Sequence, residues 1–196
     1  MFYKEIIIKY SYYTYLLRRN IWNNKGKWGK KLIISVKEVK KFIYCVLIPL
    51  LIGYLSSLIS KMICGGDMIT YYHELIKPGF APPGILFPIV WTIIYILMGT
   101  ASYIIMSHKK DEMKVKDAMF YYWLQLALNF IWSILFFGFQ LRLTALVDIA
   151  LLIIFVVIMI YNFYKIRPLA AYINIPYIMW LIYAFILNYF IWFINR

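Results

Sequence analysis

The stretch 144–164 reads TALVDIALLIIFVVIMIYNFY and carries a single charged residue, Asp148. A helix that crosses the hydrocarbon core of a bilayer needs about 20 mostly apolar residues. A strand of a membrane β-barrel would instead alternate apolar and polar side chains over about ten residues, and residues 149–160 do not alternate. We therefore expect residues 144–164 to form a transmembrane helix.

Four further apolar runs of similar length lie outside this stretch, at residues 42–60, 85–106, 118–139 and 169–194. The chain is 64% hydrophobic and 15% charged, whereas soluble domains carry about 25% charged residues. The sequence thus predicts an all-α integral membrane protein, with a bundle of five transmembrane helices over residues 42–196. Residues 1–41 are expected to form a separate basic N-terminal segment in the cytoplasm.

The net charge of +13 is concentrated in a few segments of the chain. Most lysine and arginine residues lie before the first apolar run, after the second and after the fourth. The lysine and arginine residues outside these three segments are Lys61, Lys77, Arg142 and Arg196. Basic residues mark the cytoplasmic side of membrane proteins. We therefore expect a multi-pass protein of the bacterial cytoplasmic membrane, with the N-terminus inside and the C-terminus outside. Because the charge reports topology, no nucleic acid is expected as a partner.

The connection between the first two runs, residues 61–84, is the longest. Long loops without a pattern of their own often act as lids or binding loops. Pro82 and Pro83 suit the first turn of a helix, where the missing N–H groups cost nothing. Pro88 lies one turn further in, so it should leave a carbonyl without its usual partner and bend the helix. A neighbouring helix, a side chain or water is expected to pair with that carbonyl. The sequence predicts a stiff lid above a bent wall.

Polar residues within the apolar runs recur at helical spacing. They are costly in lipid and should therefore face the bundle interior. Gln125 and Asn129 lie four residues apart, on one face of a helix. Stripes that contain Trp91, Trp132 and Trp180 would converge beneath the lid and suit a flat apolar ligand with a few polar edges. Ordinary hydrogen bonding between packed helices explains such residues equally well, so both interpretations stay open.

Four segments together resemble a known membrane family. They are KPGFAPPG with FPIVWTIIYILMGTASY (within 77–103), QLALNFIWSILFFG (125–138), ALVDIALL (145–152) and AAYINIPYIMWLIYAFILNYFIWFIN (170–195). In this order they resemble the signature of the TspO/MBR family, the translocator proteins or tryptophan-rich sensory proteins. The resemblance implies a five-helix bundle in the lipid bilayer, often a homodimer, with a pocket open toward the loop between the first two helices. It implies transport or sensing of a porphyrin or other tetrapyrrole, such as protoporphyrin IX or haem, with no cofactor required.

The resemblance also assigns ligand-binding residues in this chain. Trp91 and Trp180 match the pocket tryptophans, Tyr95, Asn129, Ala184 and Asn188 match further pocket or helix-contact positions, and Pro82 and Pro83 match the lid motif. It assigns no catalytic residue and no metal ligand. The family's lid opens with Trp-Tyr, whereas this chain has Tyr71 and Tyr72. A lid tryptophan is therefore not expected to take part in binding.

Two other functions are alternatives to binding. In the first, light- or oxygen-dependent porphyrin breakdown with the pocket tryptophans as redox partners would make the chain an enzyme. The sequence offers no nucleophile–base pair for it, and Asp148 is interpreted as a helix-cap or interface carboxylate. The second is a small-solute transporter or scaffold. Transporters favour inverted repeats and broken helices, and no internal repeat is found.

Overall fold

The computed structural model describes residues 36–66, 68–108 and 111–196. Five spans are long and apolar enough to cross a membrane. They are the first helix (Val36–Cys64), α3 (Leu86–Met106), α4 (Glu112–Ser133) with a π-helical continuation at Ile134–Gly138, α5 (Arg142–Ile166), and α6 (Pro168–Ile173) followed by α7 (Ile175–Ile194). The described residues contain no strand. The predicted all-α fold with five spans is confirmed, whereas residues 1–35 of the predicted N-terminal segment lie outside the described residues.

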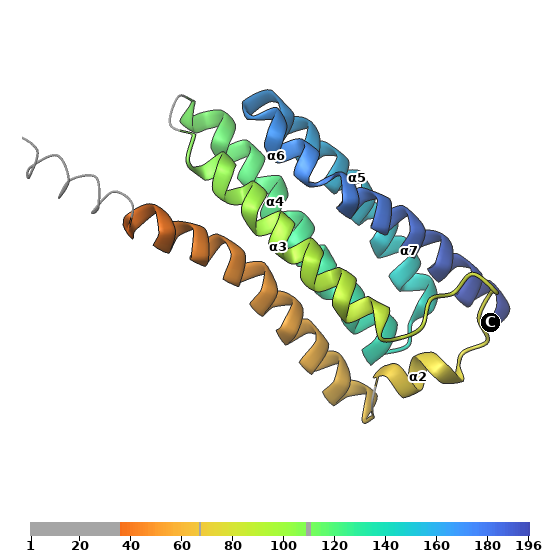
Figure 1. Cartoon of the computed structure of the whole chain (residues 1–196). Helices are drawn as coiled ribbons and strands as arrows, with labels where there is room; N and C mark the ends of the chain where they lie inside the picture. Colours follow the sequence, from red (N-terminus) through yellow and green to blue (C-terminus); the bar gives the residue numbers. More distant parts are fainter. Residues whose placement is uncertain (1–35, 67, 109–110) are drawn as a thin grey trace, which may run out of the picture. The chain divides into compact units, whose positions relative to one another are not determined.

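The spans from α3 onward pack side by side as an elongated bundle (Figure 1). Helix α5 packs against both α4 and α7, and α3 packs against α4 and α6. Large apolar side chains such as Met98, Ile105 and Val156 are completely buried between them. The first helix buries 17% of its apolar window, against 33% for each of the other spans. It therefore depends on a small number of close contacts.

Two glycines bring the first helix and α3 together. A Cβ on Gly99 of α3 would lie 2.5 Å from the Cα of Val46 and 2.6 Å from the carbonyl oxygen of Cys45. Gly53 of the first helix lies directly against the ring of Tyr95. Small residues let membrane helices approach at backbone distance. These two contacts fix the part of the helix pair that lies away from the 61–84 loop.

The two ends of α4 differ in local structure: a side-chain cap at its start and a π-helical turn at its end. Asp111 caps its start, because its Oδ1 accepts a hydrogen bond from the Lys114 N–H at 3.2 Å and its Oδ2 lies 2.7 Å from the Lys114 ammonium. The hydrogen bond from the Lys114 side chain holds the pKa of Asp111 below its usual range. At the other end the π-helix Ile134–Gly138 widens the last turn before α5. Such π-helical turns often occur at functional sites.

Pro88 lies nearer the start of its helix than the sequence predicts. Because α3 begins at Leu86, Pro88 lies in the first helical turn, where an N–H would have no partner within the helix. The Gly84 carbonyl accepts a hydrogen bond from the Phe87 N–H at 3.3 Å. This carbonyl lacks its usual partner, as predicted, but a backbone N–H of the next turn takes that place rather than a neighbouring helix, a side chain or water. The prediction that Pro82 and Pro83 lie in the first turn was wrong, since both precede the helix.

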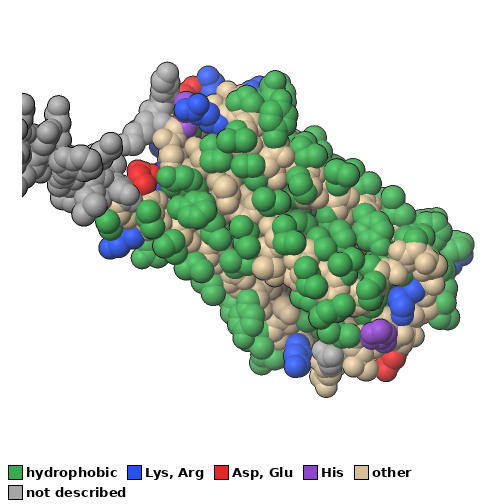
Figure 2. Space-filling view, viewed as in Figure 1, with side chains coloured by type: hydrophobic (Ala, Val, Ile, Leu, Met, Phe, Trp, Pro, Cys, Tyr) green, Lys and Arg blue, Asp and Glu red, His purple; other side chains and the backbone are tan. Residues whose placement is uncertain are grey.

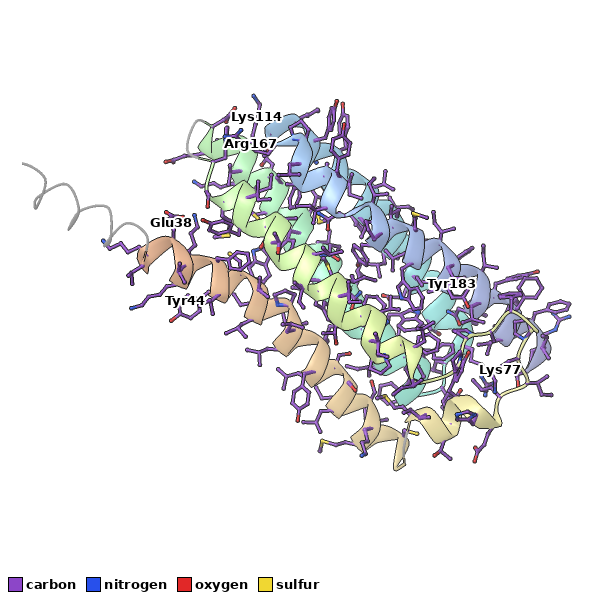
Figure 3. The ribbon with its side chains drawn as sticks, in the orientation of Figure 1. Glu38, Tyr44, Lys77, Lys114, Arg167 and Tyr183 are labelled. Carbon is purple, nitrogen blue, oxygen red and sulfur yellow. The ribbon has the colours of Figure 1, made fainter. Side chains whose placement is uncertain are left out.

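The distribution of side chains fits helices that cross a bilayer. Hydrophobic side chains cover the middle of the face in Figure 2, and charged side chains lie toward its ends. Figure 3 places Lys114 and Arg167 at one end of the bundle and Lys77 at the opposite end. Charged side chains at the bilayer centre are costly, so they gather where the helices meet water.

Candidate functional site

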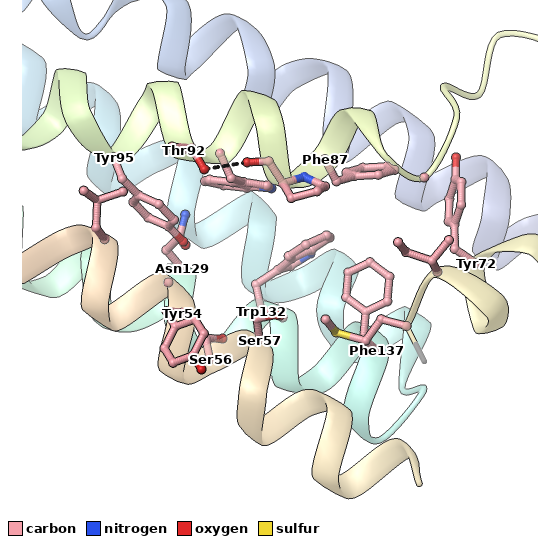
Figure 4. Close-up of a pocket in the computed structure, with 18 residues that line it drawn as sticks. Tyr54, Ser56, Ser57, Tyr72, Phe87, Thr92, Tyr95, Asn129, Trp132 and Phe137 are labelled. Carbon is pink, nitrogen blue, oxygen red and sulfur yellow. Dashed lines mark hydrogen bonds between the residues drawn. The ribbon is translucent and has the colours of Figure 1, made fainter. Parts of the chain in front are cut away.

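A cavity of about 500 Å³ lies between the first helix, α3 and α4 (Figure 4). Its roof is the short helix α2 (Met68–Glu74), which belongs to the 61–84 loop. Small-molecule sites have volumes of about 300–1,000 Å³, so the cavity is large enough for one. None of its lining residues in the described part of the chain comes from α5, α6 or α7.

One wall of the cavity is built from aromatic side chains of α3. The rings of Trp91 and Tyr95 are stacked, with centroids 5.5 Å apart and planes 29° apart. Nearer the lid, Phe87 meets Tyr72 of α2 edge to face at 5.1 Å. Aromatic pairs in these geometries contribute about 0.5–1.5 kcal/mol beyond their buried area. The wall is therefore a rigid apolar surface.

The opposite wall comes from α4 and its π-helical end. Trp132 stacks on Phe136 at 5.2 Å and meets Phe137 edge to face at 6.0 Å. In Figure 4, Trp132 and Phe137 lie across the cavity from Phe87. The indole Nε1 of Trp132 is buried and has no hydrogen-bond partner in the structure. Buried donors are nearly always paired, so this N–H is an exception among the polar groups around the cavity.

The base of the cavity is a hydrogen-bonded polar network. The Tyr95 hydroxyl donates to Asn129 Oδ1 at 2.7 Å, and Asn129 Nδ2 donates to the Tyr177 hydroxyl at 3.3 Å. Tyr177 in turn donates to Gln125 Oε1 at 2.7 Å. The network joins α3, α4 and α7, and all four side chains are buried. Connected networks of this kind hold their members in one geometry.

The third wall is the first helix, which lines the cavity with small residues. Gly53, Ser56 and Ser57 all border it. Ser56 donates a hydrogen bond to the Phe130 carbonyl at 2.7 Å and so ties this helix to α4. These small side chains leave room for a ligand between the first helix and α4.

The lid is attached to the ends of α5 and α7. Asn195 makes two hydrogen bonds with Ile76: its Oδ1 accepts from the Ile76 N–H at 3.1 Å and its Nδ2 donates to the Ile76 carbonyl at 2.8 Å. Arg142 donates to the Tyr71 hydroxyl and to the Asn195 carbonyl, both at 3.2 Å. Tyr183 donates to the Phe80 carbonyl at 3.1 Å. We call this set the lid latch.

Within the lid, two side chains satisfy backbone groups. The Lys77 ammonium lies 2.8–2.9 Å from the carbonyl oxygens of Tyr72, His73 and Leu75 and so caps the end of α2. Its three donors are thus used within the lid. Tyr72 donates to the Pro82 carbonyl at 3.0 Å. Burial, with a smaller contribution from Tyr183, raises the pKa of Tyr72 to about 12.

The predicted ligand-binding residues fall into two groups. Trp91, Tyr95 and Asn129 line the cavity. Pro82 and Pro83 lie at the lid's junction with α3 but do not line it, and their carbonyls accept hydrogen bonds from Tyr72 and Leu86.

Trp180, Ala184 and Asn188 lie on α7 and do not line the cavity. Trp180 is linked to it through Phe87, whose ring lies 5.9 Å from the indole, edge to face. Ala184 and Asn188 are buried between helices, and neither amide atom of Asn188 has a hydrogen-bond partner. The α7 stripe therefore packs within the bundle.

Asp148 differs from its interpretation as a cap. Helix α5 begins at Arg142, so Asp148 lies inside the helix, where it is buried, and its Oδ2 has no hydrogen-bond partner. The prediction of a capping role was wrong, because Asp148 is six residues beyond the first residue of the helix, too far to cap it. No group of three His, Cys, Asp or Glu side chains that could hold a metal ion occurs among residues 36–66, 68–108 and 111–196.

Several cavity residues were missed by sequence reasoning. Trp132 was placed on a polar stripe but not among the binding residues, although its N–H is free. Phe87, Phe137 and Tyr72 carry no signal in an apolar sequence, because an aromatic residue in a span is usually packing or an interface anchor. Their positions follow from the π-helical turn and the fold of the lid.

Comparison with known proteins gives a consistent family assignment. The profile described as the TspO/MBR family matches residues 45–193. The chain is 37% identical to "Tryptophan-rich protein TspO" of Chlorobaculum tepidum over 155 residues, which cover 78% of this chain and 94% of the relative. It is 36% identical to a protein of the same name from Archaeoglobus fulgidus over 159 residues, 81% of this chain and 99% of the relative.

A eukaryotic relative matches nearly as well. The chain is 36% identical to "Translocator protein" of Sus scrofa over 149 residues, which cover 74% of this chain and 85% of the relative. The matched region contains every element that forms the cavity and its roof. The chain belongs to the TspO/MBR family of membrane proteins.

Proposed function

We propose that this protein binds a porphyrin or related tetrapyrrole, such as protoporphyrin IX or haem, in the cavity beneath the lid and acts in transport or sensing. No cofactor is required. The names of its relatives, "Translocator protein" and "Tryptophan-rich sensory protein", support the transport or sensing role. The choice of a tetrapyrrole as the ligand rests on the resemblance of the sequence motifs to those of the family.

One observation carries the proposal. Two rigid aromatic walls, Trp91 with Tyr95 and Trp132 with Phe137, border a cavity of about 500 Å³. A flat conjugated ring gains from stacking on such walls, and the Asn129 side chain at the base of the cavity is one polar group of its lining. The tetrapyrrole is thus held by aromatic contact and oriented by few hydrogen bonds. Because Lys77 is engaged within the lid, propionate recognition does not depend on it.

The proposal extends to topology and assembly. The N-terminus lies inside and the C-terminus outside a bacterial cytoplasmic membrane, because Lys114 and Arg167 lie at the end of the bundle opposite Lys77. Cysteine introduced at Lys114 or at Gly79, in a variant whose Cys45 and Cys64 are both replaced by serine, and labelled by an impermeant maleimide in whole cells tests this: only Gly79→Cys should react. The protein forms a homodimer, as the resemblance implies, and light scattering of detergent-purified protein measures the mass.

Titration of the purified protein with protoporphyrin IX, followed by tryptophan fluorescence in darkness, tests the binding function. We expect saturable quenching, with the affinity about two- to tenfold weaker in Trp91→Phe, since 0.5–1.4 kcal/mol of stacking is lost. Trp123→Phe is the matched control, because Trp123 lies on α4, is 46% exposed and does not line the cavity. No saturable quenching, or equal weakening in both variants, contradicts the proposal. Loss of porphyrin absorption under light alone would instead support breakdown.

A further inference from the structure

The cavity is closed by the latched lid but has an open flank between the first helix and α3. Four lining residues border this flank and are themselves on the outer surface: Tyr54 and Ile69, 66% and 38% exposed, and Pro88 and Thr92, also exposed. A residue that both lines a cavity and lies on the surface marks an opening. The opening therefore lies on the side of the bundle.

The depth of this flank places it in the hydrocarbon region. Helix α3 has 21 residues, about 31 Å at 1.5 Å per residue, which matches a hydrocarbon core of about 30 Å. Thr92 is six residues, about 9 Å, below the lid end of α3, and Tyr54 is about 15 Å below the lid end of the first helix. Both residues thus border the acyl chains of the leaflet next to the lid.

The contacts around the cavity close its other sides, so a ligand can reach it through this flank. On the side away from the lid, Gly99 meets the backbone of Val46 and Cys45 and Gly53 lies against the ring of Tyr95, so the opening ends there. On the lid side, Asn195 makes two hydrogen bonds to Ile76, and Tyr72 bonds to Pro82. Entry from water breaks this set of bonds, whereas entry from lipid passes the exposed residues Tyr54 and Thr92 and breaks none of them.

We infer that the cavity is loaded from the bilayer, through the flank between the first helix and α3, so that its ligand is an amphiphile already dissolved in lipid. For the tetrapyrrole this step rests on the proposed function. The ring enters edge-on between Tyr54 and Thr92 and comes to lie against Trp91. The Thr92 hydroxyl donates to its own helix, at the Pro88 carbonyl, at 2.7 Å, so it presents no polar barrier to the ligand.

The opening itself is tested without any ligand in reconstituted vesicles. Lipids brominated on the acyl chain are quenchers confined to the bilayer, and acrylamide is a quencher confined to water. The Trp91 emission, taken as the difference between the parent and Trp91→Phe, is expected to be quenched by brominated lipid and not by acrylamide. Thr92→Phe should protect it from the lipid quencher. Quenching by acrylamide, or no protection in Thr92→Phe, overturns the inference.

The route is tested by the rate at which protoporphyrin IX dimethyl ester, a probe without carboxylates, quenches tryptophan in the same vesicles. Thr92→Phe is expected to slow association about tenfold, a barrier higher by about 1.4 kcal/mol, and Asn195→Ala should leave the rate unchanged. Two control variants with substitutions on the outer surface should not alter the association rate. They are Ile96→Phe, one turn below Thr92 and 41% exposed, and Tyr44→Ala, 65% exposed. Neither residue lines the cavity.

The outcomes separate the two proposals. Saturable binding of the ester with an unchanged rate in Thr92→Phe, or with faster association in Asn195→Ala, overturns the lateral route and leaves the proposed function in place. No saturable quenching in the parent overturns the proposed function. In that case the brominated-lipid measurement alone decides whether the flank is open.

Discussion

Replacing Gly99 with alanine tests how closely the first helix is held to α3. The new Cβ would lie 2.5 Å from the Cα of Val46 and 2.6 Å from the carbonyl oxygen of Cys45. Both are backbone atoms, so the clash is relieved only by moving the whole helix. Overpacking costs about 1–3 kcal/mol, and a backbone clash belongs to the upper half of that range. The higher helix propensity of alanine offsets about 0.8–1.0 kcal/mol.

The steric term is therefore larger, and Gly99→Ala should destabilise the protein by about 1–2 kcal/mol. For a chain of 150–250 residues, 1 kcal/mol corresponds to about 2–4 °C, so the Tm should fall by about 2–8 °C. Thermal unfolding in detergent, followed by near-ultraviolet circular dichroism, measures it. Gly66→Ala is the control, because a Cβ there meets nothing within 4 Å. A Gly99→Ala variant as stable as the parent would refute the close approach.

Three further outcomes are expected. Tyr95→Phe leaves the buried Asn129 Oδ1 without its donor. Hydrogen bonds in membrane proteins average about 0.6 kcal/mol and an unpaired buried group costs about 1–3 kcal/mol, so the free energy of unfolding should fall by about 1 kcal/mol. An unchanged Tm would count against the network. Asn195→Ala should speed amide hydrogen exchange at Ile76, whose N–H donates to Asn195 Oδ1; unchanged exchange would contradict the lid latch. The pKa of Tyr72 is about 12 in the folded protein and about 10 when exposed, so its contribution to lid stability is fully present below pH 10 and is lost as the pH rises from 10 to 12. The difference in tyrosinate absorbance between the parent and Tyr72→Phe measures that titration. Ionisation of Tyr72 near pH 10 would contradict the burial of its hydroxyl.

The spans were predictable because their signal is long and simple. Bilayer thickness sets the number of apolar residues, and five runs of that length gave five spans in the structure. Their ends were less predictable. Helix α5 starts at Arg142, two residues before its apolar run, and α4 extends back to Glu112. Capping and backbone hydrogen bonds continue a helix beyond the hydrophobic region.

The candidate site was predictable in part. The resemblance to the family implied Trp91, Tyr95 and Asn129 as ligand-binding residues, and all three line the cavity, because α3 and α4 turn one polar and aromatic face toward it. Trp180 lies on a stripe with the same helical spacing, yet α7 presents that face to its neighbours within the bundle. Spacing gives the face of a helix but not the neighbour that it meets.

The lid latch could not be foreseen for a related reason. Asn195 and Ile76 are 119 residues apart in sequence, and their hydrogen bonds depend on where α7 ends relative to the lid. The π-helical turn that brings Phe137 to the cavity has no periodic signature either. Contacts of this kind follow from tertiary packing, which a single sequence does not report.

A structure of the protein bound to protoporphyrin IX tests the central claim most directly. We expect the porphyrin ring between the α3 and α4 walls, in contact with Trp91 and Trp132, with its edge toward Tyr54 and Thr92. A ring held instead between α5 and α7, against Ala184 and Asn188, would contradict this account of the site.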